Sequence, residues 1–320
     1  MKRALIFGIN GQDGSFLAEI LLEKGFDVHG FYRRSSVDNL SRIRHLLSDV
    51  TLHKGDLTDY GSVHRAVAEC LPLHYVFNEA DQDHVGWSQA APSYSAAVTY
   101  GGVVNVLEAV RQLTPTTRVF QPVSATMFGD SPPRQDELTS FQPRSPYACA
   151  KVAAYYLCQH YRREHGMYVS CGILFNHDSP RRGSDYLLQR IARGEELWGD
   201  LETIVDIGYA REYMEAVWKM MQLDKPDDFV IGTGKGYQIK DLLAGVRVHP
   251  KYPLESALVA YPEKAVNAFG FDPKYDAFDV LEMVKERYRN GQSRTDLDKE
   301  GRTPADRIGD GSSSARGDSE

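Results

Sequence analysis

The segment "RALIFGINGQDGSFLAEILLEKG", residues 3–25, decides the fold of this chain. It begins with a short apolar run that ends in glycine, as a buried strand does, and residues 15–24 then carry apolar side chains at helical spacing. The turn between them, "GINGQDG" at residues 8–14, has the form GxxGxxG. Glycines in such a turn let the backbone approach a pyrophosphate, whose charge the following helix N-terminus stabilises. The segment therefore predicts a strand, a turn and a helix that together bind a dinucleotide.

Apolar runs typical of strands recur along the chain, with helical patterns between them, at residues 27–31, 50–53, 74–78, 118–123 and 168–174. This alternation predicts an α/β fold with a Rossmann-like, doubly wound parallel sheet. We expect residues 1–175 to form mainly the dinucleotide-binding domain. Residues 176–290, with helices expected at 208–223 and 280–289, should form a smaller mixed α/β lobe that binds substrate and interleaves with the sheet. Residues 291–320 are polar and charged, and we predict that they are disordered.

Composition excludes several classes of protein. A net charge of −7 argues against a nucleic-acid partner, which would require a basic face. No apolar run among the 320 residues is long enough to cross a bilayer. The cysteines have no paired spacing and no metal-ligand spacing with histidine, so we expect free thiols in a reducing cytoplasm and no metal site. These cysteines are Cys70, Cys149, Cys158 and Cys171.

The residues after the second predicted strand indicate which dinucleotide binds. Enzymes that use NAD usually place an acid there, to bind the ribose hydroxyl. This chain has Arg33, Arg34, Ser35 and Ser36 instead, and guanidinium groups with hydroxyls suit a 2′-phosphate. We therefore predict NADP, with NAD as the alternative cofactor and a solvated basic turn as the alternative role of the segment. The other predicted cofactor residues are Gly8, Gly11, Gln12, Asp13, Gly14, Asp56, Leu57 and Asn78, joined by Tyr147 and Lys151.

The catalytic candidates are Tyr147 and Lys151, a YxxxK motif within "SPYACAK". Their spacing places the phenol and the ammonium on one face of a helix. A free tyrosine has a pKa near ~10, and a nearby ammonium together with an oxidised nicotinamide should lower it. Ser124, at the end of the preceding strand, can bond the same substrate oxygen. The three residues predict removal of a proton from an alcohol whose carbon gives a hydride to the cofactor.

These motifs, with "RRSSVDNLSRIRHL", "PRSPYACAK" and "GILFNHDSPRRG", make the chain resemble an extended short-chain dehydrogenase/reductase that acts on nucleotide sugars. The group it resembles is GDP-mannose 4,6-dehydratase, over nearly the whole chain to about residue 290. The resemblance implies NADP, a nucleotide-diphospho-sugar substrate and a homodimer or homotetramer. It also implies that Asn176 contacts the sugar-phosphate region and that the "RRSS" segment contributes to contacts between subunits.

Two motifs depart from the pattern of that group. After the fifth strand the group has STSE(L/M)YG, whose glutamate is the acid/base for water loss, whereas residues 123–129 here read "VSATMFG". Thr126 takes the place of the glutamate, and "SAT" is similar to the motif of nucleotide-sugar 4-epimerases such as UDP-galactose 4-epimerase. The group's NLAAQSHV is "NEADQDHV" here, which adds Glu79, Asp81 and Asp83. Asp83 replaces a serine that points toward substrate and is a candidate contact, with a solvated loop as the alternative. The roles of Glu79 and Asp81 stay open.

Arginines that the resemblance implies for the diphosphate are missing near residues 205–208 and 252–255. Arg182 and Arg211 could compensate for them. The nucleotide, GDP, ADP or UDP, therefore stays open, as does the choice between a hexose and a heptose. His84 is included in the substrate set, with a hydrogen-bonded loop histidine as its alternative, and His177 is expected to be such a loop histidine. The predicted substrate residues are Asp83, His84, Ser124, Thr126, Asn176, Arg182 and Arg211.

The residues and the resemblance together predict a nucleotide-sugar 4-epimerase, similar in its combination of motifs to heptose-nucleotide 4-epimerases. The sugar would be oxidised transiently at C4, and the hydride would return to the opposite face. The alternatives are a 4,6-dehydratase that uses a different acid, a reductase of 4-keto sugars, and a catalytically silent NADP sensor.

Overall fold

The computed structural model describes residues 1–197, 199–248 and 257–300, with side chains described to residue 290. Its centre is a seven-stranded sheet in the order β3-β2-β1-β4-β5-β6-β9, and all of its strand pairs are parallel. The strands predicted from the sequence are all present. The bounds are β1 (Arg3–Phe7), β2 (Asp27–Arg33), β3 (Val50–Gly55), β4 (Tyr75–Asn78), β5 (Arg118–Ser124), β6 (Val169–Leu174) and β9 (Phe229–Ile231).

Helices cover both faces of this sheet, and each face has its own apolar core. One face packs against α2 (Tyr60–Glu69), α5 (Gly102–Leu113) and α6 (Pro146–Glu164). The other packs against α1 (Gln12–Glu23), α8 (Ala210–Met220) and the short α10 (Glu263–Phe269). Because parallel strands need crossover connections, helices on both faces are the expected partner of such a sheet. The predicted doubly wound α/β fold is confirmed.

A second, three-stranded sheet in the order β10-β8-β7 forms the smaller lobe. It consists of β7 (Asn176–Asp178), β8 (Ile204–Tyr209) and β10 (Gly236–Gln238), and β8 pairs in parallel with β7 and antiparallel with β10. A separate core joins it to α7 (Leu187–Ala192), α9 (Ile239–Ala244) and α11 (Ala277–Glu300). The chain returns from this sheet to the main sheet through α8 and β9.

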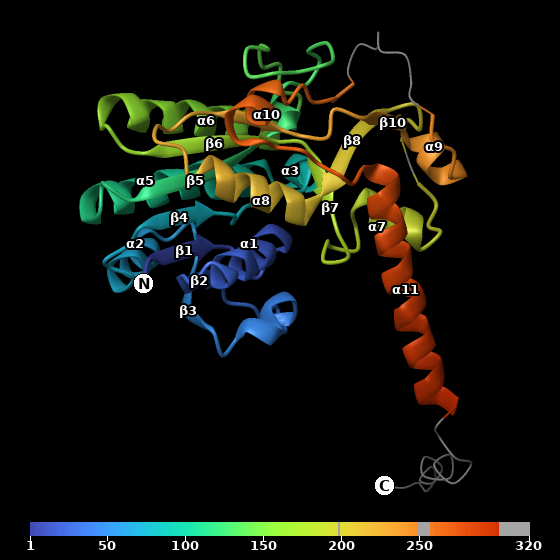
Figure 1. The fold of residues 1–320 in the computed structure, drawn as a ribbon, viewed down its shortest axis with the longest axis horizontal. Helices are drawn as coiled ribbons and strands as arrows, with labels where there is room; N and C mark the ends of the chain where they lie inside the picture. Colours follow the sequence, from blue (N-terminus) through green and yellow to red (C-terminus); the bar gives the residue numbers. More distant parts are fainter. Residues whose placement is uncertain (198, 249–256, 301–320) are drawn as a thin grey trace, which may run out of the picture.

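Helix α11 corrects the boundary that was predicted for the end of the ordered chain. It runs from Ala277 to Glu300 and therefore continues into the segment that was predicted to be disordered from residue 291. Within its part with described side chains, 277–290, the first turns bury apolar groups, among them Val280, Leu281 and Val284. Figure 1 shows the rest of the helix projecting from the body of the molecule. The remainder of the predicted disordered segment, 301–320, lies outside the described residues.

Short helical segments complete the described chain: η1 (Ser41–Leu46), α3 (Val85–Ala90), α4 (Pro92–Ala96), η2 (Ala97–Gly101) and η3 (Ala125–Met127). Segments η3 and α3 lie next to the ends of β5 and β4, where side chains converge on a common cavity. Among the helices that the structure describes, none is long and apolar enough to span a membrane.

Candidate active site

A cavity of about 550 Å³ opens at the carboxyl ends of β1, β4, β5 and β6 and reaches the smaller lobe. This is the edge of an open parallel sheet at which ligands bind. The cavity is lined by the three predicted catalytic residues and by most of the predicted substrate residues. Those brought together are Ser124, Tyr147, Lys151, Asp83, His84, Thr126, Asn176 and Arg182.

The hydroxyl groups of Ser124, Thr126 and Tyr147 lie together in this cavity. Ser124 ends β5, and its Oγ accepts hydrogen bonds from the backbone N–H of Thr126 at 3.2 Å and from its Oγ1 at 2.9 Å. Tyr147 lies in the first turn of α6, which Ser145 caps by accepting from a backbone N–H at 3.1 Å. Its phenol lines the same cavity as Ser124, which acts to lower the pKa of the phenol. Lys151 follows one turn later, with its Nζ 5.6 Å from the centroid of the Tyr147 ring. The predicted helical arrangement of the motif is confirmed.

The ammonium of Lys151 is paired with a carboxylate that the sequence left without a role. Its Nζ lies 2.6 Å from Oδ2 of Asp81 and donates to the carbonyl of Pro122 at 2.8 Å. Thr99 donates to the other oxygen of Asp81 at 2.6 Å. The side chains of Lys151 and Asp81 are 4% and 11% exposed, so the pair is formed away from water. Asp81 therefore neutralises the cation of the YxxxK motif.

The pKa of Tyr147 reflects this pairing. Burial raises it well above its usual range, and the carboxylates of Asp81 and Asp83 raise it further, against the hydrogen bond from Ser124. The predicted lowering of this pKa by Lys151 together with an oxidised nicotinamide stays a prediction, since in the protein alone the charge of Lys151 is matched by Asp81. A cationic group bound in the cavity would be needed to favour the phenolate.

Glu79 is a second acid that the sequence left unassigned. It follows β4 directly, its carboxyl lines the cavity, and its Oε1 is buried with no hydrogen-bond partner among the residues that the structure describes. Burial raises the pKa of Glu79 well above its usual range, and the nearby charge of Asp13 adds to this, while Lys151 opposes it. Glu79 therefore adds a buried carboxyl group with a raised pKa to the cavity.

Asp83 faces the lobe side of the cavity. Its carboxylate accepts from the guanidinium of Arg182 at 2.9 Å and from the hydroxyl of Tyr186 at 2.8 Å. The same guanidinium stacks 3.7 Å from the centroid of the Tyr186 ring. His84 lies 3.7 Å from a carboxylate oxygen of Asp185. Asp83 thus lines the cavity together with other predicted substrate residues. It binds Arg182, which was expected to compensate for the missing diphosphate arginines.

Asp13 and His177 form a buried ion pair at 2.9 Å beside the glycine turn. Burial alone would raise the pKa of Asp13, but His177 and Arg182 outweigh it and lower it to about 2. Burial alone would lower the pKa of His177, but Asp13 raises it above its usual range. The other ring nitrogen of His177 bonds to the carbonyl of Phe175 at 2.8 Å. His177 is hydrogen-bonded, as predicted, but it lies on strand β7 and not in a loop, and its partner Asp13 is a predicted cofactor residue.

The glycine turn has the shape of a phosphate cradle. Gly8 has φ +78°, and a Cβ there would lie 2.8 Å from the backbone of Ala80. A Cβ on Gly14 would lie 2.3 Å from the carbonyl oxygen of Gly8. Gly11, Gln12 and Asp13 line the cavity at the start of α1. Because side chains are excluded where the helix begins, the turn fits a pyrophosphate at this point.

A second hollow of about 440 Å³ lies at the ends of β2 and β3 and is lined by Arg33, Arg34, Lys54, Gly55 and Asp56. Arg33 and Arg34 are exposed, as are Ser35 and Ser36, and a nitrogen of Arg33 donates to the hydroxyl of Tyr94 at 2.8 Å. Lys54 adds a cation that was not predicted for this site, although its place at the end of a strand was visible in the sequence.

Seven predicted residues line neither hollow: Gly8, Gly14, Ser35, Ser36, Leu57, Asn78 and Arg211. Leu57 is buried and contacts α5 near Gly102, and the buried Asn78 donates to Gln121 at 2.8 Å. Arg211 is on α8, where it pairs with Glu19 at 3.1 Å, with Glu23 at 3.0 Å and with Glu215 at 3.3 Å. The structure therefore does not bring Arg211 to the predicted substrate site. Arg42, which was not predicted, lines the main cavity instead and donates to the carbonyl of Arg181 at 2.6 Å.

Comparisons with known proteins agree with this geometry. A family model described as GDP-mannose 4,6 dehydratase matches residues 5–253. GDP-mannose 4,6-dehydratase of Vibrio cholerae serotype O1 is 43% identical over 305 residues, covering 88% of this chain and 81% of the relative. GDP-mannose 4,6 dehydratase 2 of Arabidopsis thaliana is 42% identical over 264 residues, covering 76% and 70%.

Solved structures share the fold at lower identity. UDP-glucose 4-epimerase of Thermotoga maritima, solved with UDP-glucose, has a TM-score of 0.78 at 23% identity and covers 91% of this chain and 99% of that one. dTDP-glucose 4,6-dehydratase of Bacillus anthracis, solved with NAD, has a TM-score of 0.78 at 17% identity and covers 92% and 98%. Epimerases and dehydratases thus have the same fold as this chain, so the fold does not distinguish between these two reactions.

Proposed function

Because the chain belongs to the GDP-mannose 4,6-dehydratase family, we propose that it is an enzyme that acts on a nucleoside-diphosphate sugar with a bound nicotinamide dinucleotide. We further propose that its reaction is inversion at C4 of the sugar. The observation that carries this proposal is the group of hydroxyls on Ser124, Thr126 and Tyr147, in which no carboxylate occupies the position of Thr126. Hydroxyl groups are sufficient for oxidation and reduction of an alcohol, whereas loss of water requires a further acid and base.

The residues at the glycine turn and the second hollow are the proposed cofactor site. Gly8, Gly11 and Gly14 would take the pyrophosphate at the start of α1. Arg33, Arg34 and Lys54 line the hollow at the ends of β2 and β3, and their charges support NADP over NAD. Solved proteins of this fold were crystallised with NAD, which supports a nicotinamide dinucleotide in general. The bound nicotinamide supplies an acceptor and donor of the C4 hydride.

The chain's own groups would move the proton. Ser124 holds the C4 oxygen, and the Tyr147 oxygen takes the proton of the C4 hydroxyl and later returns it to the C4 oxygen. Burial and the charge of Asp81 raise the pKa of Tyr147, and a cationic nicotinamide held at this site would favour the phenolate that Tyr147 needs. The proton and the hydride both return to the sugar, so the cycle has no net redox change. Inversion follows when the 4-keto sugar turns before the hydride returns.

The second candidate function is 4,6-dehydration, and two observations favour it. The similar relatives are named as GDP-mannose 4,6-dehydratases, and Glu79 supplies a carboxyl group with a raised pKa in the cavity. However, Glu79 follows β4, whereas the residue that takes the place of the dehydratase glutamate is Thr126, after β5 and bonded to Ser124. The carboxyl that the dehydratase pattern has beside this serine is therefore a hydroxyl here. This difference supports inversion over water loss.

The product distinguishes the two functions. We expect GDP-, ADP- and UDP-linked hexoses and heptoses, screened with the cofactor-loaded protein, to include one that gives a product of unchanged mass. Glu79→Gln should keep that reaction within about tenfold, because a group that is not the catalytic acid or base lacks the ~10²–10⁴-fold contribution of one. Liquid chromatography with mass spectrometry measures the mass of the product and the rate at which Glu79→Gln forms it.

Other outcomes of this screen would contradict the proposal. A product lighter by one water, lost in Glu79→Gln, would establish the dehydratase with Glu79 as its acid/base. Consumption of one reduced cofactor for each sugar would indicate a reductase, and binding of the cofactor without turnover of any sugar would indicate a sensor. The predictions of a homodimer or homotetramer and of a cytoplasmic location stay predictions.

Asp81→Asn should shift the pH dependence of the reaction toward acid. Removing this carboxylate removes a negative charge near Tyr147 and leaves the ammonium of Lys151 unmatched, and both changes lower the pKa of the phenol. Because the phenolate is the active form, activity falls as the pH drops through that pKa. The acid limb of the profile of kcat/KM against pH should therefore move to lower pH by about one unit. The exposed Asp49→Asn is the matched control, and an unmoved or alkaline-shifted limb in Asp81→Asn would refute this role.

A further inference from the structure

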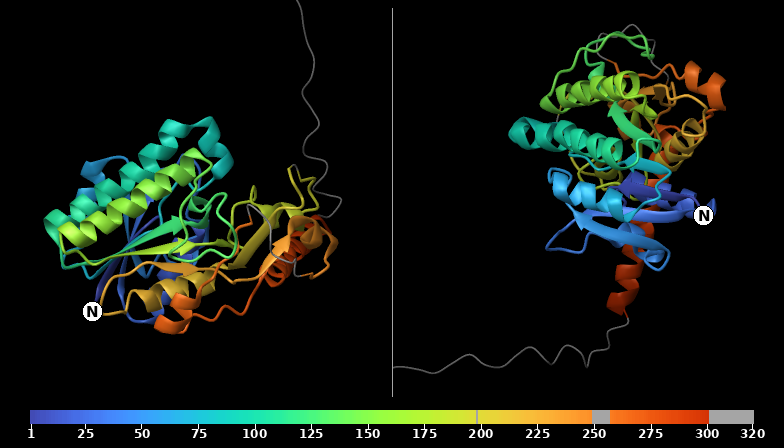
Figure 2. Two further views of the ribbon diagram at one scale, coloured as in Figure 1. Left: turned by 90° about the horizontal axis from the view of Figure 1, so that it is seen from above. Right: turned by 90° about the vertical axis from the view of Figure 1, so that its left-hand side faces the viewer.

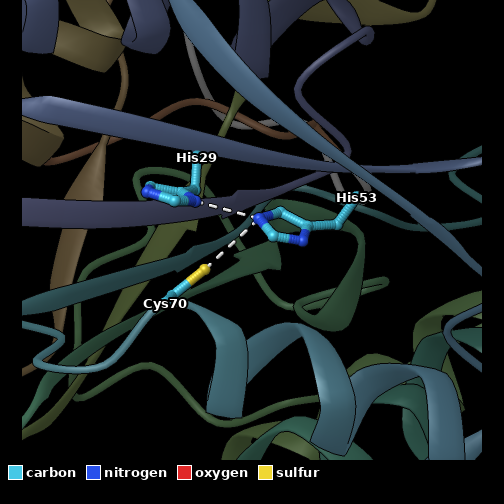
Figure 3. A group of neighbouring side chains, drawn as sticks. All are labelled: His29, His53 and Cys70. Carbon is cyan, nitrogen blue, oxygen red and sulfur yellow. Dashed lines mark hydrogen bonds between the residues drawn. The ribbon is translucent and has the colours of Figure 1, made fainter.

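Two histidines and a cysteine converge at one edge of the main sheet, and none of them lines either hollow of the proposed active site. His29 is on β2, His53 is on the edge strand β3, and Cys70 immediately follows α2. Nδ1 of His29 lies 2.9 Å from Nε2 of His53, and the sulfur of Cys70 lies 3.5 Å from the same Nε2. The three ligand atoms lie within 4.8 Å of one another, and Figure 3 shows the side chains pointing toward a common centre.

A carboxylate holds the outer nitrogen of each imidazole. Nε2 of His29 lies 3.4 Å from Oδ1 of Asp27, and Nδ1 of His53 lies 3.0 Å from Oε2 of Glu69. This is the arrangement found behind metal-binding histidines, where a carboxylate fixes the tautomer and turns the other nitrogen toward the ion. Asp27 and Glu69 thus orient the two rings so that Nδ1 of His29 and Nε2 of His53 point toward the centre.

Counting hydrogens shows what the centre lacks. The two rings make three contacts through their nitrogens, one with each carboxylate and one with each other. Two neutral imidazoles carry only two ring N–H groups, so one contact has no proton unless a ring is charged. A metal ion at the centre removes this conflict. Each ring then keeps its N–H for its carboxylate and gives the lone pair of its inner nitrogen to the ion.

Burial and charge also suit a divalent ion. Cys70 is fully buried and His29 is 7% exposed. The charge of Asp27 is matched by Arg3 at 2.6 Å, which leaves Glu69 and, once deprotonated, the Cys70 thiolate. These two negative charges balance one dication.

We propose that His29, His53 and Cys70 form a zinc site that ties the edge strand β3 to β2 and α2. Sulfur with two imidazoles is a ligand set that zinc accepts, with a water or another group as fourth ligand. Zinc bonds of about 2.0–2.1 Å to nitrogen and about 2.3 Å to sulfur place tetrahedral ligands about 3.3 Å (nitrogen to nitrogen) and 3.6 Å (nitrogen to sulfur) apart. The imidazoles need to separate by only a few tenths of an ångström. The sequence did not reveal the site, because its ligands are far apart along the chain and have no motif spacing.

The test uses the full, tag-free chain, stripped with a chelator and then titrated with Zn²⁺ alone. We expect one equivalent to bind, measured by elemental analysis after dialysis and by calorimetry. At a free Zn²⁺ concentration of about 100 times Kd, the melting temperature should rise by about 5 °C, because the ion binds only the folded chain. Co²⁺ in place of Zn²⁺ should give a thiolate-to-cobalt charge-transfer band in the near ultraviolet.

The site variants are Cys70→Ser and His53→Gln. The matched control is Cys149→Ser, which replaces an exposed thiol outside the site. Cys70→Ser should lose the cobalt band, and both site variants should bind Zn²⁺ at least about 10-fold more weakly, as for loss of one ligand or its support. Cys149→Ser should leave all three readouts unchanged. Substoichiometric binding in the unaltered chain, or equal binding in the site variants, would overturn the proposal. Because none of the three ligands lines the cavity, these results are independent of the proposed reaction.

Discussion

Tyr147→Phe should lower kcat by about 10³-fold or more while leaving cofactor affinity within about threefold, because the phenol oxygen is the only group removed and acid/base groups contribute ~10²–10⁴-fold. The ring fills buried space in the first turn of α6, and phenylalanine keeps that packing. The loss should appear in kcat and kcat/KM alike, because the proton is transferred only in the reacting complex. Steady-state kinetics and titration of the cofactor into stripped protein measure the two effects.

Tyr156→Phe is the matched control for this variant. Tyr156 is on the same helix, is 57% exposed and lies away from the cavity, so its replacement should leave kcat unchanged. If Tyr147→Phe instead loses cofactor binding and its melting transition together, the tyrosine is mainly a structural residue, and the assignment of the base is wrong.

Arg34→Ala should weaken NADP binding by about 10- to 100-fold, which corresponds to one charge-assisted hydrogen bond of ~1.5–3 kcal/mol. NAD binding should stay within about threefold, because NAD lacks the 2′-phosphate. Arg34 is the better choice for this test than Arg33, because a nitrogen of Arg33 already bonds to Tyr94. Calorimetric titration of both dinucleotides gives the selectivity directly.

Arg163→Ala, at an exposed position of α6, controls for the loss of one surface charge. The difference between the two variants should shrink as salt is added, since the contact is exposed and therefore screened. Equal loss of NADP and NAD affinity in Arg34→Ala would assign this arginine to a part that both cofactors share, and the preference for NADP would then lack its physical basis.

The sheet and the catalytic motif could be predicted because their signals are local. A glycine turn between a strand and a helix, or two side chains four residues apart on a helix, is fixed by nearby sequence. The start of α6 is an example, because the consecutive residues Ser145, Pro146 and Tyr147 specify both the helix cap and the start of the YxxxK motif.

The electrostatic partners could not be predicted, because they are set by packing between distant segments. Asp81 follows β4 and reaches Lys151 on α6, and the charge of Asp81 raises the pKa of Tyr147. Arg211 was expected at the substrate, but α8 packs against α1 and directs it to Glu19 and Glu23. The charge of Arg211 does not indicate whether it faces the substrate site or the acidic residues of α1.

The central claim is that the hydroxyls of Ser124, Thr126 and Tyr147 support inversion at C4 of the sugar without loss of water. The most direct measurement follows a substrate deuterated at C4, run in heavy water with the cofactor-loaded protein and analysed by mass spectrometry and NMR. The proposal predicts a product of the opposite C4 configuration that retains its deuterium at C4 and carries no solvent deuterium at C5. A product lighter by one water, with the label moved from C4 to C6, would contradict it and would identify the chain as a 4,6-dehydratase.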